Sequence, residues 1–433
     1  MNKREYKQRR NSLMKHLGKN AIAIIPTASE KTRNRDSHFP FRPDSDFVYL
    51  TGFKEPESVA VLIPGRKNAQ YVLFCRENDK MMEIWNGRRV GLEGAQADYD
   101  VEEAYPIDKL DEVLPQLLEN RERVFYSIGN DENFDKRLIE WVNKVRLKAR
   151  AGIVAPQEFI SLDHLVHEMR LIKSPAEIRT MRKAANIASE AHIKAMQACK
   201  PGMREHAVEA EISHTFTKHG CPPAYTSIVG GGENACILHY NENDAELEDG
   251  HLLLIDAGAE QDCYASDITR TFPVNGKFST EQKTIYEIVL KAQLAAINKV
   301  KPGNHWNQPH EAAVRELTKG LVEVGLLKGD LKKLIKDEAY KTFYMHRTGH
   351  WLGMDVHDVG DYKINGKWRP LKPGMVLTIE PGLYIAAGTK GVAKKWWDIG
   401  VRIEDDVLVT EDGYDVLSKK APKTVEEIEK LMA

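Results

Sequence analysis

The sequence predicts an α/β domain over residues 1–172, followed by an α+β domain with an internal two-fold repeat over residues 173–433. Three observations predict this division. Short apolar runs alternate with helical patterns in the first part, a helix-start signal stands at Ser174, and a helix followed by Lys-Pro-Gly occurs twice in the second part. A chain of 433 residues is also long for one ordinary core.

The first part of the chain carries short apolar runs of the kind that form strands, separated by segments with helical periodicity. Leu13, Met14 and Leu17 predict one face of a first helix. We expect strands at 21–25, 46–50, 58–63, 70–74 and 123–128, and helices at 108–118 and 132–147. The sequence shows no metal-ligand cluster, phosphate-binding loop or nucleophile elbow here, so the expected role of this domain is oligomerisation or gating of substrate.

The second domain begins at a capping box. Ser174 is followed by proline at the first helical position and by glutamate three residues on, and Ser279 opens a second box in the same way with glutamine. Each predicted helix then runs into Lys-Pro-Gly, at 200–202 and at 301–303, a separation of 101 residues. The repeat predicts a pseudo-symmetric domain with a cleft between two similar halves.

Composition excludes several classes of protein. The formal net charge of −2 favours neither nucleic acid nor an anionic membrane as partner, and no apolar run approaches the roughly 20 residues of a membrane helix. The basic segment 1–10 is not followed by a signal-peptide core. The five cysteines are scattered and lack a C-x-x-C pair, which favours free thiols in a reducing, cytoplasmic compartment over disulfides or a zinc-thiolate site.

Three acids stand at the ends of apolar runs. Asp256 follows 251–255, Glu380 follows the run that starts at Gly374, and Glu404 follows the run that starts at Ile399. A carboxylate in this position must find a cation, hydrogen-bond donors or water. Asp267 lies eleven residues after Asp256, and the intervening glycine and polar residues predict a turn, so these two acids could converge from neighbouring strands of a hairpin.

Histidines complete the candidate site. His346, His350 and His357 occur within twelve residues, and His239 is a fourth candidate. One acid at a strand end is usually a turn or cap residue, and one histidine is usually structural, so only the set as a whole indicates a site. The candidate ligands are four carboxylates and one imidazole, Asp256, Asp267, His350, Glu380 and Glu404.

This oxygen-rich set suits two divalent cations, most naturally Mn²⁺, with Co²⁺ or Zn²⁺ as alternatives. Two ions about 3.5–4 Å apart can share a water, lower its pKa and polarise a carbonyl, which is machinery for hydrolysis. The histidines are suitable donors to the charge that develops on the attacked oxygen. Arg402, two residues before Glu404, would either orient a ligand carboxylate or form an ordinary surface salt bridge.

The chain resembles the aminopeptidase P family of pita-bread metallopeptidases, and the resemblance covers both domains. It rests on the segments 256–258, 266–271, 350–358, 378–384 and 401–406 in the second domain and on 33–37, 45–53 and 84–89 in the first. The resemblance implies an α/β N-terminal domain and a pita-bread metallopeptidase catalytic domain of α+β class with pseudo-two-fold symmetry. It also implies a homo-oligomer, either a dimer or a tetramer.

By resemblance, the five candidate ligands hold two metal ions, with Asp267 and Glu404 bridging them. Glu380 matches the residue that accepts a proton from the bridging hydroxide and passes it to the leaving amine. The other implied roles are contacts with substrate and the tetrahedral intermediate by His239 and His357, lining of the pocket by His346, and support by Tyr384 and Arg402. Trp85 matches a tryptophan that reaches the substrate pocket of a neighbouring subunit.

The expected function is therefore that of a cytoplasmic dimanganese aminopeptidase. It would release the N-terminal residue from peptides with proline in second position, by attack of a metal-bridging hydroxide on the Xaa-Pro bond. Proline specificity comes from the resemblance, because spacing alone indicates only a dinuclear hydrolase. Two alternatives stay open. One is an Xaa-Pro dipeptidase (prolidase), which shares all five ligands, and the other is a binding module or metal-free hydrolase that keeps the fold without the metals.

Overall fold

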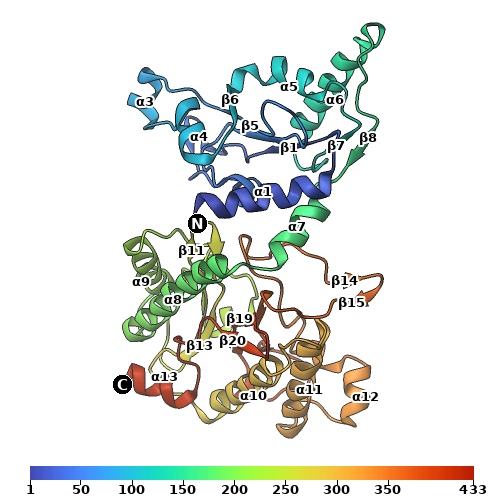
Figure 1. Cartoon of the computed structure of the whole chain (residues 1–433). Helices are drawn as coiled ribbons and strands as arrows, with labels where there is room; N and C mark the ends of the chain where they lie inside the picture. Colours follow the sequence, from blue (N-terminus) through green and yellow to red (C-terminus); the bar gives the residue numbers. More distant parts are fainter. The chain divides into compact units, whose positions relative to one another are not determined.

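The computed structural model describes all 433 residues and separates into two compact units, Met1–Arg170 and Leu171–Ala433 (Figure 1). Each unit consists of strands covered by helices. None of its helices combines the length and the hydropathy needed to cross a bilayer.

The first unit is built on a mixed six-stranded sheet in the order β6-β5-β4-β1-β7-β8. Strand β1 pairs antiparallel with β4 and parallel with β7, and β5–β6 and β7–β8 are also parallel. The strands are β1 (Ala21–Pro26), β4 (Val59–Leu62), β5 (Tyr71–Cys75), β6 (Glu103–Pro106), β7 (Arg123–Phe125) and β8 (Glu158–Ile160), and a separate hairpin joins β2 (Thr32–Asn34) to β3 (Ser37–His38).

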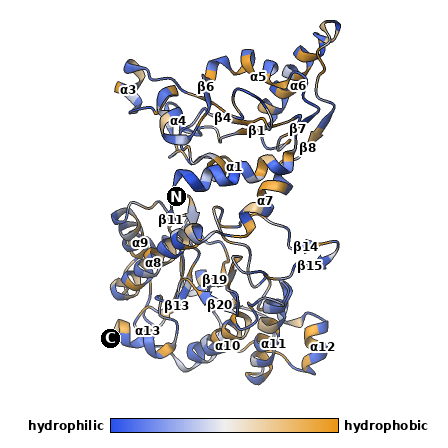
Figure 2. Ribbon diagram, in the orientation of Figure 1, coloured by the Kyte–Doolittle hydropathy of each residue, from blue (hydrophilic) through white to orange (hydrophobic).

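Helices complete the α/β unit. Their bounds are α1 (Lys3–Leu17), α2 (Ser45–Thr51), α3 (Lys80–Asn86), α4 (Gly91–Tyr99), α5 (Leu110–Leu118) and α6 (Glu132–Arg146), with α7 (Asp163–Leu171) at the end of the unit. The buried faces of α5 and α6 pack on the central strands, where Leu114 and Trp141 join Ile22 and Val72 in one apolar cluster. Their amphipathic colouring in Figure 2 agrees with this packing. The α/β prediction is confirmed, although β6, β8, α3 and α4 were not predicted.

The predicted strand at 46–50 is wrong, because this segment forms helix α2. The side chain of Asp44 accepts a hydrogen bond from the Phe47 amide as N-cap, and Gly52 ends the helix in the left-handed region at φ 72°. At the other end, Arg9 and Arg10 of α1 donate to the carbonyls of Tyr49 and Leu50, each at 3.0 Å. These arginines are buried in a helix that is largely hydrophilic in Figure 2. The helix caps and the hydrogen bonds from these two arginines therefore outweigh the preference of the sequence Phe-Val-Tyr-Leu for a β-strand.

Asp44, the N-cap residue of α2, is expected to contribute to the stability of the fold. Asp44→Ala is expected to lower the free energy of unfolding by about 1 kcal/mol, because one helix donor loses its acceptor. The measurement is urea unfolding at equilibrium, followed by circular dichroism. Asp108→Ala, at an acid in the short 3-10 turn before α5, serves as the control and should change stability less. Equal effects of the two changes would contradict the capping role of Asp44.

The second unit begins with the predicted helices. They are α8 (Pro175–Ala198), α9 (Glu205–Lys218), α10 (Thr280–Ile297) and α11 (Asn307–Glu323), followed by α12 (Leu331–Lys336) and, at the C-terminus, α13 (Val425–Met432). Both capping boxes form, at Ser174 and at Ser279. Both Lys-Pro-Gly turns place their glycine at positive φ, 85° at Gly202 and 88° at Gly303. The two helix pairs therefore have the same local construction.

Two three-stranded antiparallel sheets follow the helix pairs, in the orders β13-β10-β9 and β16-β19-β20. The larger strands are β9 (Ile228–Gly231), β10 (Leu252–Asp256), β13 (Thr269–Pro273), β16 (Val376–Ile379), β17 (Gly382–Ile385), β18 (Ile399–Arg402), β19 (Asp405–Val409) and β20 (Tyr414–Val416). Short hairpins are formed by β11 (Glu260–Gln261) with β12 (Tyr264–Ala265) and by β14 (Lys363–Ile364) with β15 (Lys367–Trp368).

The sheets meet where the predicted site residues lie. Strand β18 pairs with β17 and lies against β10 and β13. The Glu404 amide donates to the Thr269 carbonyl at 3.1 Å, and the Asp267 amide donates to the side chain of Asp406 at 3.1 Å. In Figure 1, α8 and α9 lie on one side of these strands and α10 and α11 on another. The strand ends of both halves are thus brought to one place inside the unit.

Candidate metal centre and active site

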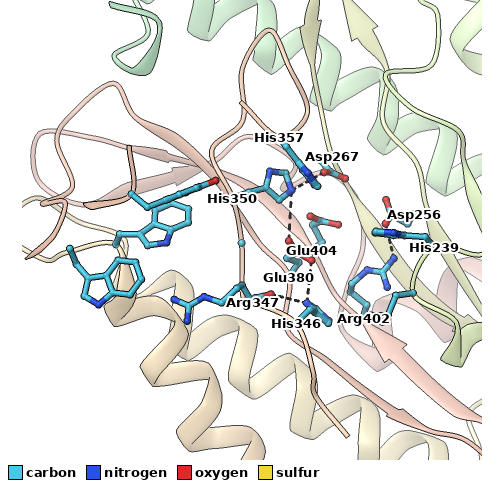
Figure 3. A pocket seen from close by; sticks show the side chains of 15 residues that line it. His239, Asp256, Asp267, His346, Arg347, His350, His357, Glu380, Arg402 and Glu404 are labelled. Atoms are coloured by element: carbon cyan, nitrogen blue, oxygen red, sulfur yellow. Dashed lines mark hydrogen bonds and ion pairs between the residues drawn. The ribbon is translucent and has the colours of Figure 1, made fainter. Parts of the chain in front are cut away.

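A cavity of about 480 Å³ opens in the second unit, and nine of the predicted site residues line it (Figure 3). These nine are His239, Asp256, Asp267, His346, His350, His357, Glu380, Arg402 and Glu404. Tyr384 does not line the cavity but contacts two residues that do. The structure therefore gathers residues that are up to 165 positions apart in the sequence, from His239 to Glu404.

The two acids of the predicted hairpin converge. Asp256 ends β10, where it pairs with Thr269 of the antiparallel strand β13, and Asp267 stands two residues before Thr269. The hydroxyl of Tyr225 lies 2.6 Å from Asp256 Oδ1 and 2.5 Å from Asp267 Oδ1, so its single proton is shared between the two carboxylates. One phenol thus fixes one oxygen of each acid and leaves the other oxygens for further partners.

His350 presents its Nε2 atom to the carboxylates. Its Nδ1 atom donates to the Trp351 carbonyl at 2.9 Å, which assigns the ring proton to Nδ1 in the neutral imidazole. Nε2 lies 3.3 Å from Asp267 Oδ2 and 3.7 Å from Glu380 Oε1. The Nε2 atom therefore faces two carboxylate oxygens, an arrangement that either a proton on this nitrogen or a cation between the groups would satisfy.

Glu380 and Glu404 are the remaining acids. Glu380 lies between β16 and β17, and Glu404 lies between β18 and β19, so each occupies the break between two strands. Thr269 donates to Glu404 Oε2 at 2.6 Å, and Thr378 donates to Glu380 Oε1 at 3.4 Å. Oxygens from Asp267 and Glu404 and a ring nitrogen of His350 all lie within 4.8 Å of one another.

Burial and mutual repulsion perturb these groups strongly. Burial, with the nearby charges of Asp267 and Glu380, raises the pKa of Glu404 well above its usual value, and burial raises the pKa of Glu380 to about 7. Burial opposes charge on His350, but Asp267 and Glu380 outweigh it and raise the histidine pKa to about 9. Four carboxylates face a single buried guanidinium here. The donor set fits divalent cations, which would offset the excess negative charge.

Arg402 is that guanidinium, and it belongs to a hydrogen-bonded chain rather than to a surface salt bridge. It is 4% exposed and donates from Nη2 to Asp256 Oδ2 at 2.6 Å and from Nη1 to the Tyr384 hydroxyl at 3.1 Å. The Tyr384 hydroxyl lies 2.8 Å from His346 Nε2, and His346 Nδ1 donates to the Arg347 carbonyl at 2.7 Å. Burial and the Arg402 charge lower the pKa of His346 to about 3, which keeps this ring neutral.

His239 and His357 reach the cavity from exposed positions. The ring of His357 lies 4.1 Å from that of His350, centroid to centroid. Burial, followed by the charge on His350, lowers the pKa of His357. Figure 3 places His239 beside Asp256 and Arg402, and His357 beside Asp267 and His350. Both imidazoles are thus available to a ligand in the cavity.

Trp85 lies in the other unit, on α3, and is 78% exposed. No residue of α3 is buried, and Met81, Met82 and Ile84 of the same helix are exposed as well. The structure therefore places Trp85 in an exposed apolar surface of the first unit.

A second group of metal-type donors lies in the first unit, where the sequence indicated none. Oxygens of Asp46 and Asp163 and a nitrogen of His167 lie within 4.8 Å of one another. Asp46 already pairs with Arg170 at 2.7 Å and with His167 at 3.2 Å, and Ser127 donates to Asp163. The Asp46 carboxylate thus already has the Arg170 guanidinium and the His167 ring as partners, and these contacts link α2 to α7.

Three residues that support the ligands were not predicted. Tyr225 holds Asp256 and Asp267, Thr269 holds Glu404, and Asp406 accepts from the Asp267 amide. The sequence signal for Thr269 and Asp406 was their position next to predicted ligands. Tyr225 follows two prolines in a loop about thirty residues before Asp256, and nothing in its local pattern indicates its partners.

Tyr225→Phe is expected to weaken metal affinity about 10- to 100-fold, because groups that orient ligand carboxylates typically contribute this much. The measurement is calorimetric titration of metal-stripped protein with Mn²⁺. Tyr414→Phe, at an exposed hydroxyl that bonds Asn298, is the matched control and should bind Mn²⁺ normally. An unchanged affinity for Tyr225→Phe would contradict its supporting role.

Comparison with known proteins agrees with this geometry. Residues 179–411 match metallopeptidase family M24, and residues 6–126 match the N-terminal domain of aminopeptidase P. The chain belongs to metallopeptidase family M24, in its aminopeptidase P branch. This M24 protein is 45% identical to the Xaa-Pro aminopeptidase of Haemophilus influenzae over 431 residues, which cover 99% of this chain and 97% of that protein.

Solved structures of this M24 branch have the same fold. The aminopeptidase PepP of Pseudomonas aeruginosa matches with a TM-score of 0.99 and 57% identity, covering 100% of this chain and 98% of that one. A zinc-substituted aminopeptidase P of Escherichia coli in complex with product matches with a TM-score of 0.97 and 45% identity, with coverage of 100% and 98%. The pita-bread fold is therefore confirmed, and this M24 protein is a metallopeptidase.

Proposed function

We propose that this metallopeptidase is a dinuclear, manganese-dependent Xaa-Pro aminopeptidase. The observation that carries the proposal is the convergence of four carboxylates and the Nε2 atom of one histidine in a cavity that also contains three further imidazoles. The relatives named Xaa-Pro aminopeptidase match over nearly the whole chain, and one aminopeptidase P of Escherichia coli was solved with substrate. The full-length match to them favours this activity over that of a prolidase.

In this proposal Asp256, Asp267, His350, Glu380 and Glu404 would hold two divalent ions. When bound, the two ions supply a hydroxide from water and polarise the carbonyl of the bond to be cut. The chain's own residues then orient the peptide and move protons.

Glu380 acts as the proton carrier. One of its oxygens faces His350 Nε2 and the other lies 3.6 Å from His346 Nδ1, so the carboxylate stands at the centre of the site. A proton accepted there has a short path to the departing nitrogen of proline. His239 and His357 donate hydrogen bonds to the carbonyl oxygen as it gains negative charge. Arg402 and Tyr384 hold Asp256 and His346 in place.

The assay of this function uses metal-stripped protein with and without Mn²⁺. The substrates are Arg-Pro-Pro, the dipeptide Arg-Pro, and Arg-Ala-Pro as a control for the second residue. We expect release of arginine from Arg-Pro-Pro only with metal, and little release from Arg-Ala-Pro. Cleavage of the dipeptide alone would move the assignment to prolidase, and no cleavage of any peptide would favour a binding module.

We further propose that the enzyme works in the cytoplasm as a homo-oligomer, a dimer or tetramer, whose contacts include α3. Two features support this: all five cysteines are free, and α3 carries four exposed large apolar side chains. Large exposed apolar patches commonly mark interfaces between proteins. The occupant that we propose is a second copy of the chain, with Trp85 directed toward its pocket.

Trp85→Ala is expected to shift the protein toward smaller assemblies or to raise KM for longer Xaa-Pro peptides, while the metal content stays unchanged. Sedimentation, steady-state kinetics and elemental analysis measure these effects. Ile139→Ala, at an exposed side chain on α6, is the matched control. Loss of metal in Trp85→Ala would contradict a role remote from the chain's own ligands.

A further inference from the structure

Arg347 lines the cavity at the end remote from Asp256. Figure 3 shows Asp256 and Arg402 on one side of the carboxylates of Glu380 and Glu404, and Arg347 on the other side. The cavity thus has an acidic centre and a separate cationic end. A peptide whose N-terminal ammonium lies among the acids would extend its later residues along the remaining length of the cavity.

The charge of Arg347 is available to a ligand. The other lining guanidinium, Arg402, is paired with Asp256 at 2.6 Å. Arg347 is exposed, and its side-chain hydrogen bond goes to the neutral amide oxygen of Asn307. The Asn307 amide nitrogen in turn donates to Glu311 at 2.7 Å, which fixes the direction of the amide. One nitrogen of Arg347 is therefore anchored, and the remaining donors of its planar group stay free for an anion.

The guanidinium of Arg347 lies over the indole of Trp368, in a cavity with two other aromatic side chains. Its central carbon lies 5.4 Å from the ring centroid of Trp368, and Lys363 Nζ lies 4.3 Å from the same centroid. Trp306 and Tyr362, with ring centroids 4.6 Å apart, line the same cavity. A guanidinium stacked on an indole loses little further freedom when it binds a ligand, so it favours bidentate recognition over a loose surface contact.

A tight β-hairpin carries Trp368. Strands β14 and β15 form a hairpin whose two connecting residues, Asn365 and Gly366, both have positive φ, 50° and 75°. Asn-Gly is the preferred sequence for such a two-residue turn. Arg347 comes from a loop about twenty residues before Trp368 and immediately follows His346. One segment therefore supplies both an imidazole and the cationic end of the cavity.

We propose that Arg347 is a specificity residue that binds a carboxylate on the part of the peptide after proline. The carboxylate is either the free C-terminus of a short peptide or an acidic side chain. Planar guanidinium and carboxylate groups match in two parallel hydrogen bonds, and their charges attract in a partly desolvated pocket. This inference rests on the proposed Xaa-Pro aminopeptidase function and names the peptides that it prefers.

The test compares kcat/KM for two pairs of peptides with Mn²⁺-loaded enzyme. The first pair is Ala-Pro-Ala and its C-terminal amide, and the second is Ala-Pro-Glu-amide and Ala-Pro-Gln-amide. The wild type should prefer the carboxylate in at least one pair by about ten-fold or more, mainly through KM. The pair that shows the preference identifies whether the C-terminus or an acidic side chain is bound.

Three variants distinguish recognition of the carboxylate by Arg347 from changes in folding or metal content. Arg347→Met should reduce the preference to about one, and Arg347→Lys should leave an intermediate preference because lysine keeps the charge without the planar fork. Lys367→Met removes an exposed cation beside Trp368 that does not line the cavity, and it should keep the wild-type preference. Thermal unfolding and metal content of each variant show that the fold is retained.

A wild type that cleaves all four peptides without preference would overturn the inference and leave the proposed function standing. Persistence of the preference in Arg347→Met would also overturn it. Failure of the wild type to cleave any of the four peptides would instead overturn the proposed function, and this inference with it.

Discussion

Replacing Glu380 with glutamine is expected to lower kcat by a factor of about 10³ or more. The change removes the charge of one proposed metal ligand and the proposed proton carrier together, and positioned acid–base groups alone typically contribute about 10²- to 10⁴-fold. The Glu380 carboxylate lies 3.7 Å from His350 Nε2 and 3.6 Å from His346 Nδ1, so no other carboxylate occupies the same place between these rings.

The measurement is steady-state hydrolysis of Arg-Pro-Pro together with elemental analysis of the purified variant. Glu323→Gln, at an exposed acid near the end of α11, is the matched control and should have wild-type kcat. Metal retention in Glu380→Gln with a greatly reduced kcat would separate the proton-carrying role from the ligand role. Near-normal turnover would refute both roles.

Removing the metal is expected to abolish activity and to lower the melting temperature. Asp256, Asp267, Glu380 and Glu404 surround one buried guanidinium, and the pKa of Glu404 is raised by burial and by neighbouring carboxylates. Bound cations relieve this repulsion in the folded state only. When the free ion concentration is 100 times the Kd, binding of one ion stabilises the folded state by about 2.7 kcal/mol.

Calorimetry of chelator-treated protein with increasing Mn²⁺ measures this effect without any assay of activity. Asp267→Asn is the informative variant, because it should show a smaller rise in melting temperature with Mn²⁺ than the wild type does. Asp330→Asn, at the N-cap of α12, lies outside the cavity and should respond to Mn²⁺ as the wild type does. A melting temperature that is indifferent to metal in the wild type would contradict the proposed centre.

Local sequence patterns determined the helix starts and the positions of the candidate ligands. The capping boxes at Ser174 and Ser279 form as predicted, because the residues of a capping box all lie within one helical turn. Asp256, Glu380 and Glu404 lie at or beside strand ends, as the polarity change at the end of each apolar run indicated. Such features depend on neighbours in the chain, which the sequence displays directly.

Tertiary structure decided the features that depend on distant partners. Segment 45–51 is a helix because donors from Arg9 and Arg10, on another element, add to its local caps at Asp44 and Gly52. Tyr225 joins Asp256 to Asp267 through a loop with no periodic pattern. The sequence therefore determined which groups could carry metal chemistry in this protein. The register of β10 with β13 and the contact of β18 with both decided that these groups share one cavity, because residues far apart in the chain come together only through tertiary contacts.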